Sequence, residues 1–217
     1  MLDAALLEAI GRADTTIWDF DGVLADTEPL QMRAYQQILA EDGHVLDEAT
    51  FSGLVGRKEP EIWGHLRERG IRPSAPIEDI VERRADLFLA LCDKEALQPD
   101  RRIRELIASA RGERIVLSSG RERVIRSLLV RWGLDGHFTS VHALADRPEP
   151  KGAELRRLVA ERRSGSATWR GALVEDSPAM LAEAAQLGMV TVAVAHGLND
   201  HAALAHADFV LPATLEA

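Results

Sequence analysis

The sequence predicts an α/β fold with a doubly wound, Rossmann-like parallel sheet and an inserted helical domain. Two observations predict the sheet: short, largely apolar runs rich in β-branched residues recur along the chain, and helical patterns separate them. Such runs are typical of strands buried on both faces, as in a parallel sheet covered by helices. A third observation, the lack of such runs between residues 29 and 97, predicts the insert.

Each apolar run is expected to form one strand of the sheet. The runs are residues 16–18, 115–117, 139–141, 172–174, 190–194 and 209–211. Helical patterns cover residues 121–131, 153–162 and 179–187, and residues before the first strand form a short amphipathic pattern. Gly133 and Gly188 follow two of these helices, where a left-handed glycine commonly ends a helix.

The insert has a helical pattern of its own. Val81, Ala85, Phe88 and Cys92 recur at spacings of four, three and four residues, which places them on one helix face. We therefore expect a catalytic core of residues 1–28 and 98–217 and a helical cap domain of residues 29–97. The length of 217 residues suits a core of about 150 residues plus such an insert.

Composition excludes several classes of partner. Lys and Arg number 26 against 35 Asp and Glu, a net charge of −9, which argues against nucleic acid and anionic membrane surfaces. The only cysteine, Cys92, excludes an intramolecular disulfide and a thiolate zinc site. No apolar run approaches the roughly 20 residues of a membrane span, and no secretory signal is visible, so we expect a cytoplasmic protein with no membrane partner.

A first acidic pair follows the first predicted strand. Asp19 and Asp21 are two residues apart in an extended segment and so point the same way, and Gly22 permits a tight turn directly after them. In open α/β sheets, binding sites form outside the carboxyl ends of the strands, where this pair falls. The alternative is that both are turn aspartates.

A second acidic pair, Glu175 and Asp176, follows another predicted strand. Together with Asp19 and Asp21, it would bring four carboxylates to neighbouring strand ends, where they repel one another unless a cation is present. Oxygen ligands without thiol or clustered histidine suit Mg²⁺. Alternatively, Asp176 caps the helix that follows.

Two further segments predict an anion site beside these acids. In Ser118-Ser119-Gly120 a strand turns into a helix, and a hydroxyl and a helix N-terminus together suit a phosphate. The loop that begins at Arg147 brings Lys151 to the start of the next helix. A lysine there opposes the helix dipole, which indicates another role unless it is simply solvated.

The order of these motifs resembles the haloacid dehalogenase superfamily of phosphohydrolases. The motifs are Asp-x-Asp-Gly-Val at residues 19–23, a serine after a strand, a lysine, and Glu-Asp-Ser at residues 175–177. The chain is most similar to the helical-cap branch that includes phosphoglycolate phosphatase and beta-phosphoglucomutase, and the likeness covers nearly the whole chain. It implies an Mg²⁺-dependent phosphomonoester hydrolase that acts on a small phosphorylated metabolite through an aspartyl-phosphate intermediate.

The resemblance also implies residue roles. Asp19 is expected to be the nucleophile, and Asp21 the general acid and then the base, with its carbonyl on Mg²⁺. Ser119, with the backbone at Gly120, is expected to hold the phosphoryl group, and Ser118 is the less favoured choice. The implied metal ligands are Asp19, Asp21, Asp176 and, directly or through water, Glu175.

Two positions depart from the pattern of this branch. Arg147 stands where the branch usually has lysine, while Lys151-Gly152 matches the lysine of other branches, so we favour Lys151 and keep Arg147 as the alternative. Gln31 stands where related mutases have a histidine. An amide cannot transfer protons, which disfavours mutase activity.

Selectivity is expected to come from the cap. Arg57 and Lys58 are the basic residues that we expect to face the active site and hold an anionic end of the substrate, unless they are only solvated. A sugar-phosphate mutase, a haloacid dehalogenase and a low-turnover phosphate-binding regulatory protein stay open as alternatives. A monomer and a homodimer are both compatible with the sequence.

Overall fold

The computed structural model describes residues 2–145, 147–195 and 204–212. The chain divides into two compact units, a core unit of Met1–Asp26 with Gln98–Ala217 and a helical unit of Thr27–Leu97. The junction falls at residues 26 and 27, two residues before the expected position. No helix of the described residues combines the length and the apolar character needed to cross a bilayer.

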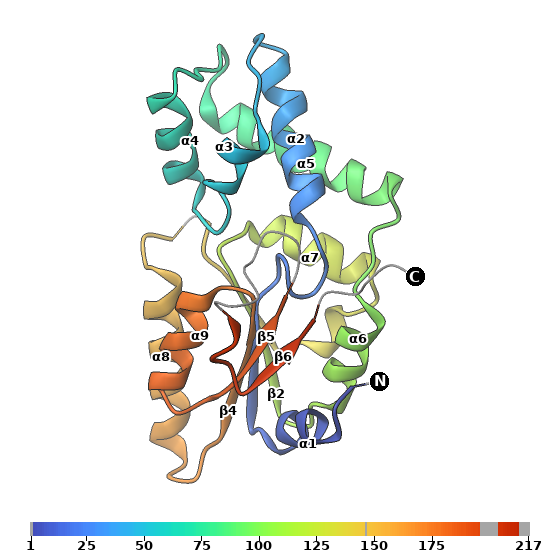
Figure 1. Ribbon diagram of the computed structural model, residues 1–217, viewed down its shortest axis with the longest axis vertical. Coiled ribbons are helices and arrows are strands. Elements are labelled where there is room, and N and C mark those ends of the chain that lie inside the picture. The colour runs from blue at the N-terminus through green and yellow to red at the C-terminus, as the bar shows by residue number, and fades with distance from the viewer. Residues whose placement is uncertain (1, 146, 196–203, 213–217) are drawn as a thin grey trace. The chain divides into compact units, whose positions relative to one another are not determined.

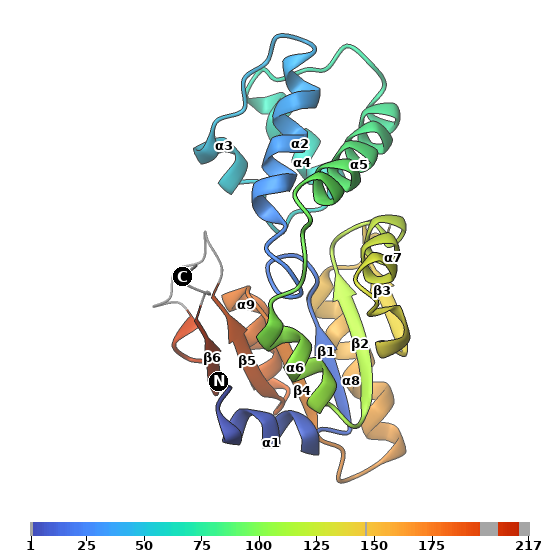
Figure 2. The same ribbon diagram turned by 90° about the vertical axis from the view of Figure 1, so that its right-hand side faces the viewer.

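The described part of the core unit contains a six-stranded parallel sheet in the order β3-β2-β1-β4-β5-β6 (Figures 1 and 2). Its strands are β1 (Thr15–Trp18), β2 (Glu113–Ser118), β3 (Ser140–Ala143), β4 (Gly171–Glu175), β5 (Val190–Val194) and β6 (Phe209–Leu211). The α/β prediction is therefore confirmed. Five of the predicted runs lie within these strands, and β3 begins one residue later than expected and extends two residues further.

Helices cover both faces of this sheet, as a doubly wound fold requires. They are α1 (Ala4–Arg12), α6 (Arg101–Ser109), α7 (Glu122–Arg131), α8 (Lys151–Gly165) and α9 (Pro178–Gln186), with a 3-10 turn at Asp135–His137. Figure 2 shows α6 in front of the sheet and α8 behind it. The face under α8 and α9 buries Leu155, Leu158 and Met180 against Ile17 and Leu173 of the central strands.

The strand order determines where a site can form. β1 lies between β2 and β4, and Trp18 pairs with Val116 on one side and with Val174 on the other. The chain continues from β1 through β2 to β3 on one side and then crosses to β4 on the other, so the direction of winding reverses beside β1. Such a switch point leaves a crevice outside the strand ends, which is the usual ligand position in open α/β sheets.

The helical unit consists of α2 (Glu28–Ala40), α3 (Glu48–Ser52), α4 (Glu59–Glu68) and α5 (Ile77–Lys94), joined by turns. The predicted face of α5 is buried: Val81, Ala85, Phe88 and Cys92 are each at most 5% exposed. Aromatic side chains fill much of the interior, where Tyr35 packs at tilted angles on both Phe51 and Trp63. The insert therefore consists of helices joined by turns, as predicted.

Candidate active site

Asp19 continues the strand β1 into the crevice. Its backbone N–H donates to the carbonyl of Val174, 2.9 Å away, which extends the pairing with β4 by one residue. Its Oδ1 accepts the N–H of Phe20 at 2.7 Å. The chain then turns tightly, because the N–H of Leu24 donates back to the carbonyl of Phe20. The Asp19 carboxylate is buried at the end of the central strand.

Gly22 lets this turn approach β4 closely. Its φ is +71°, a conformation that residues with a side chain rarely adopt. A Cβ at this position would lie 2.3 Å from Oδ2 of Asp176, far inside van der Waals contact. The loop after β1 and the acid after β4 are therefore packed directly together, as their places at neighbouring strand ends predict.

Three buried carboxylates meet here. Asp19, Glu175 and Asp176 each offer an oxygen, and these oxygens all lie within 4.8 Å of one another. The fourth predicted acid, Asp21, is half-buried, and its Oδ2 lies 3.5 Å from the position that a Cβ of Gly120 would take. Asp21 thus approaches the loop after β2, while the other three acids form the carboxylate group.

Lys151 brings a positive charge to this group. Its Nζ lies 2.7 Å from Oδ2 of Asp19 and 2.8 Å from Oε2 of Glu175, and its side chain is 13% exposed. α8 begins at Lys151 itself, two residues before the predicted start, because Pro150 accepts the first helical N–H groups at its carbonyl. Arg147, the alternative cation, has a half-exposed side chain whose Nη1 lies 4.0 Å from Glu154.

Burial dominates the electrostatics of these groups. It raises the pKa of Asp19 well above its usual range, the neighbouring Glu175 raises it further, and Lys151 opposes the change. Burial likewise raises the pKa of Glu175, against the effect of Lys151. For Lys151 burial disfavours the charge, but Asp19 and Glu175 outweigh it and leave the pKa above its ordinary value.

This balance makes the carboxylate group suitable for a hard divalent cation. Lys151 contacts two of the three buried acids, and its single charge cannot balance three carboxylates if all of them are ionised. The donors are carboxylate oxygens only, which is the ligand type that Mg²⁺ prefers. The residues present therefore fit the expected Mg²⁺.

The loop after β2 supplies hydrogen-bond donors beside Asp21. Ser118 is fully buried, and its Oγ accepts the N–H of Gly120 at 2.9 Å, so this hydroxyl supports the turn. Ser119 and Gly120 are partly exposed, and α7 begins at Glu122. A hydroxyl, a backbone segment and a helix N-terminus thus follow one another at this strand end, an arrangement that suits an anion.

Comparison with known proteins identifies the family. A family model described as haloacid dehalogenase-like hydrolase matches residues 16–194. The chain belongs to this family. The resemblance drawn from the motifs is confirmed, and the match spans both the core unit and the helical unit.

Relatives of this hydrolase include phosphatases. A "Phosphorylated carbohydrates phosphatase" of Thermotoga maritima is 29% identical over 209 residues, covering 91% of this chain and 92% of the relative. The solved structure of CbbY from Rhodobacter sphaeroides in complex with phosphate superposes with a TM-score of 0.78 at 25% identity, covering 92% and 93% of the two chains. A candidate beta-phosphoglucomutase of Thermotoga maritima gives 0.68 at 25% identity, covering 92% and 94%. The enzyme class is that of phosphoric monoester hydrolases.

The residues predicted to give this family member its substrate selectivity lie in the helical unit. Arg57 and Lys58 form the connection between α3 and α4, where the exposed Arg57 donates from Nε to the carbonyl of Gly53 at 2.6 Å. Lys58 directly precedes α4. Gln31 accepts a hydrogen bond at Oε1 from Nη1 of Arg84 at 2.6 Å.

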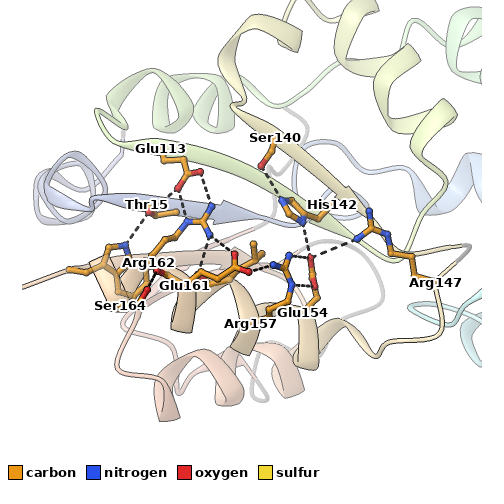
Figure 3. Close-up of polar contacts among 12 residues, drawn as sticks. Thr15, Glu113, Ser140, His142, Arg147, Glu154, Arg157, Glu161, Arg162 and Ser164 are labelled. Carbon is orange, nitrogen blue, oxygen red and sulfur yellow. Dashed lines mark hydrogen bonds and ion pairs between the residues drawn. The ribbon is translucent and has the colours of Figure 1, made fainter. Parts of the chain in front are cut away.

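The sequence predictions missed one polar network of the core unit. Neither His142 nor Glu154 is among the site residues predicted from the sequence. Figure 3 shows that they meet: Nδ1 of His142 lies 2.8 Å from Oε1 of Glu154, one helical turn after Lys151. The sequence holds one signal for this contact: Glu154 lies on the same helix face as Leu155 and Leu158, which indicates a buried carboxylate.

Proposed function

We propose that this chain is an Mg²⁺-dependent phosphatase that acts on a small phosphorylated metabolite through an aspartyl-phosphate on Asp19. The observation that carries the proposal is the contact of Asp19 with Lys151 inside a group of three buried carboxylates. An isolated carboxylate would be repelled by a phosphate dianion, so a nucleophilic aspartate needs cations beside it.

The first step forms the phosphoenzyme. An Asp19 oxygen attacks phosphorus, the bond from phosphorus to the substrate oxygen breaks, and Asp21 donates a proton to the leaving alkoxide. Lys151 offsets the negative charge of the incoming phosphoryl group. Ser119 and the backbone at Gly120 hold its oxygens, while the Ser118 hydroxyl stays engaged in the turn.

The second step releases phosphate. Asp21, now a carboxylate, accepts a proton from the attacking water, and the bond between phosphorus and Asp19 breaks. This alternation of roles requires Asp21 to be near the phosphoryl site without joining the carboxylate group. Its position toward the loop of Gly120 supports that assignment.

Mg²⁺ would be held by Asp19, Glu175 and Asp176, with the Asp21 carbonyl added on the family resemblance. When bound, it neutralises the carboxylates and the phosphoryl oxygens. The high pKa of Asp19 supports this view, because a buried acid needs a neighbouring positive charge to be ionised at neutral pH.

The substrate class that we favour is sugar phosphates. The support is the curated relative, a phosphatase of phosphorylated carbohydrates, together with the phosphate complex of CbbY. Arg57 and Lys58 are proposed to bind a second anionic end of the substrate. A sugar-phosphate mutase is the second candidate because of the likeness to a candidate beta-phosphoglucomutase, although Gln31 offers no proton-transfer group.

A panel assay tests this proposal. Purified protein is incubated with sugar phosphates, phosphoglycolate and nucleotides, and released inorganic phosphate is measured with Mg²⁺ and after chelation. We expect release that depends on Mg²⁺ and is fastest for sugar phosphates. Transfer of phosphate within a hexose without net release, followed by ³¹P NMR, would instead establish a mutase. Release that persists unchanged under chelation would contradict the Mg²⁺ assignment.

A further inference from the structure

Glu154 is a buried carboxylate in the first turn of α8, three residues after Lys151. Its side chain is 6% exposed. Arg157 donates from Nη2 to Oε1 at 2.6 Å and from Nε to Oε2 at 2.8 Å. His142 reaches the same carboxylate from β3, with its Nδ1 2.8 Å from Oε1 (Figure 3). One buried side chain therefore connects the start of α8 to a strand of the sheet.

His142 is itself held in a defined orientation. Its Nε2 lies 3.1 Å from Oγ of Ser140 on the same strand, and its backbone pairs in register with Leu117 of β2. In the tautomer that donates from Nδ1 to Glu154, Nε2 accepts a hydrogen bond from the Ser140 hydroxyl. Ser140, His142 and Glu154 thus form a chain of hydrogen bonds that runs from β3 to α8.

Apolar packing alone does not define the position of Lys151. Leu155, Leu158 and Val159 hold α8 against the sheet, but hydrophobic contact is non-directional and permits small shifts along and about the helix axis. Hydrogen bonds weaken steeply as their angles change, so the bond to Glu154 resists such shifts. Glu154 lies within one helical turn of Lys151, so a bond that fixes Glu154 also fixes the end of α8 that carries the ammonium.

We propose that His142 and Glu154 are positioning residues that hold Lys151 between Asp19 and Glu175. The inference rests on the proposed function, because it assigns Lys151 a role in phosphoryl transfer. The ammonium contacts both carboxylates at 2.7 and 2.8 Å, so it has little room for displacement. A displacement of about 1 Å in an active site reduces turnover by up to roughly a hundredfold.

The chain offers a matched control at the other end of α8. Arg162 donates from Nε and Nη2 to the two oxygens of Glu113 on β2, at 2.6 and 2.7 Å. This pair also ties α8 to the sheet through a doubly bonded carboxylate, but it lies about 16 Å from Lys151 along the helix. Glu113→Ala therefore removes a comparable attachment without touching the Lys151 end.

The first experiment compares steady-state kinetics of His142→Ala, Glu154→Ala and Glu113→Ala with an aryl phosphate, with folding checked by thermal unfolding. We expect kcat to fall roughly tenfold or more in the first two variants with KM nearly unchanged, and to stay near wild type in Glu113→Ala. His142→Asn places an amide N–H where Nδ1 lies and should restore most of kcat. Equal losses in all three alanine variants, or no rescue by asparagine, would overturn the proposal.

The second experiment does not depend on turnover. Mass spectrometry follows the reductive methylation of Lys151 by formaldehyde and cyanoborohydride, which should be slow in the wild type and at least severalfold faster in His142→Ala and Glu154→Ala. Glu113→Ala should retain the slow rate. Unchanged protection of Lys151 in the His142 and Glu154 variants would overturn the positioning role. An inactive wild-type protein with the expected labelling pattern would instead count against the phosphatase proposal.

Discussion

Nζ of Lys151, at the start of α8, lies 2.7 Å from Oδ2 of Asp19, at the end of β1. This contact joins the cation and the proposed nucleophile across the switch point of the sheet. Arg147 belongs to a different set of contacts, because its guanidinium faces Glu154. The geometry thus favours Lys151 over Arg147 as the cation of the phosphatase motif.

Replacing Lys151 tests this choice. Lys151→Met keeps the length of the side chain and removes its charge, so the phosphoryl group meets uncompensated carboxylates. We expect kcat to fall at least about a hundredfold. Arg147→Met should change kcat by less than about threefold, measured as phosphate release under the same conditions. The reverse ranking would make Arg147 the functional cation.

Gly22→Ala tests the close approach of the loop after β1 to Asp176. Alanine is strained at the φ of +71° found here, and its methyl group would lie 2.3 Å from Oδ2 of Asp176. We therefore expect loss of stability and loss of activity. Gly43 is the control, since its φ is +76° and a Cβ there would have no neighbour within 4 Å. Gly43→Ala should cost only about 1 to 2 kcal/mol and leave turnover unchanged.

The comparison is made by thermal unfolding and phosphate release. For a chain of this size, 1 kcal/mol corresponds to about 2 to 4 °C in Tm. A Gly22→Ala protein as stable and active as Gly43→Ala would show that the loop relaxes away from Asp176 without consequence.

A buried ion pair in the helical unit predicts a large stability effect. The side chain of Arg84, 8% exposed, pairs with Glu59 and also bonds Gln31. Arg84→Met leaves the largely buried Glu59 carboxylate without this partner, although Trp63 still donates to it, and should cost about 3 kcal/mol. Next to it, Arg83 pairs with Glu41 where both side chains are half-exposed, so Arg83→Met should change the free energy of unfolding far less than Arg84→Met.

Denaturant unfolding followed by tryptophan fluorescence measures this difference, because Trp63 lies in the interior of the helical unit. Similar losses in the free energy of unfolding for Arg84→Met and Arg83→Met would mean that the Arg84–Glu59 pair stabilises the protein no more than a surface ion pair does.

Glu154 predicts a specific loss of stability in acid. Hydrogen bonds from Arg157 lower the pKa of Glu154 from 4.5 to about 2, against the effect of burial, and His142 adds to the lowering. A lowered pKa in the folded state stabilises the protein above the unfolded value and loses that contribution as pH falls through the folded one. Because Arg157 is half-exposed and solvent screens its charge, the contribution is at most about 3 kcal/mol at neutral pH, and it should disappear between about pH 4.5 and pH 2.

Glu154→Gln removes this titration while keeping the size of the side chain. The free energy of unfolding of wild type should therefore exceed that of Glu154→Gln at pH 7, and the difference should shrink toward pH 2. The groups that face this side chain are His142, Arg147 and Arg157, and none is altered by the substitution. A difference that stays constant with pH would exclude the lowered pKa.

Much of the core unit was predictable because buried parallel strands leave a strong pattern. Val190–Val194 and Phe209–Leu211 are strands with the predicted bounds. Helix α6 was not assigned, although Ile103, Leu106 and Ile107 follow a helical spacing; the neighbouring arginines masked it. The sequence thus predicts helices and strands best where one or both faces of the helix or strand are continuously apolar.

The site was predictable only in part. Carboxyl ends of adjacent parallel strands meet at one edge, so the convergence of Asp19 with Glu175 and Asp176 follows from the sheet alone. Which cation reaches them depends on where α8 begins, and that is fixed by the turn at Pro150. The contact of His142 with Glu154 depends on the path of the intervening loop, which no periodic pattern describes.

Asp19→Asn tests the assignment of Asp19 as the nucleophile. The amide has nearly the same shape but cannot form the aspartyl-phosphate, so phosphate release from an aryl phosphate should fall by roughly 10⁴-fold or more while the thermal unfolding transition is retained. Turnover of the folded Asp19→Asn protein at the wild-type rate would contradict the mechanism.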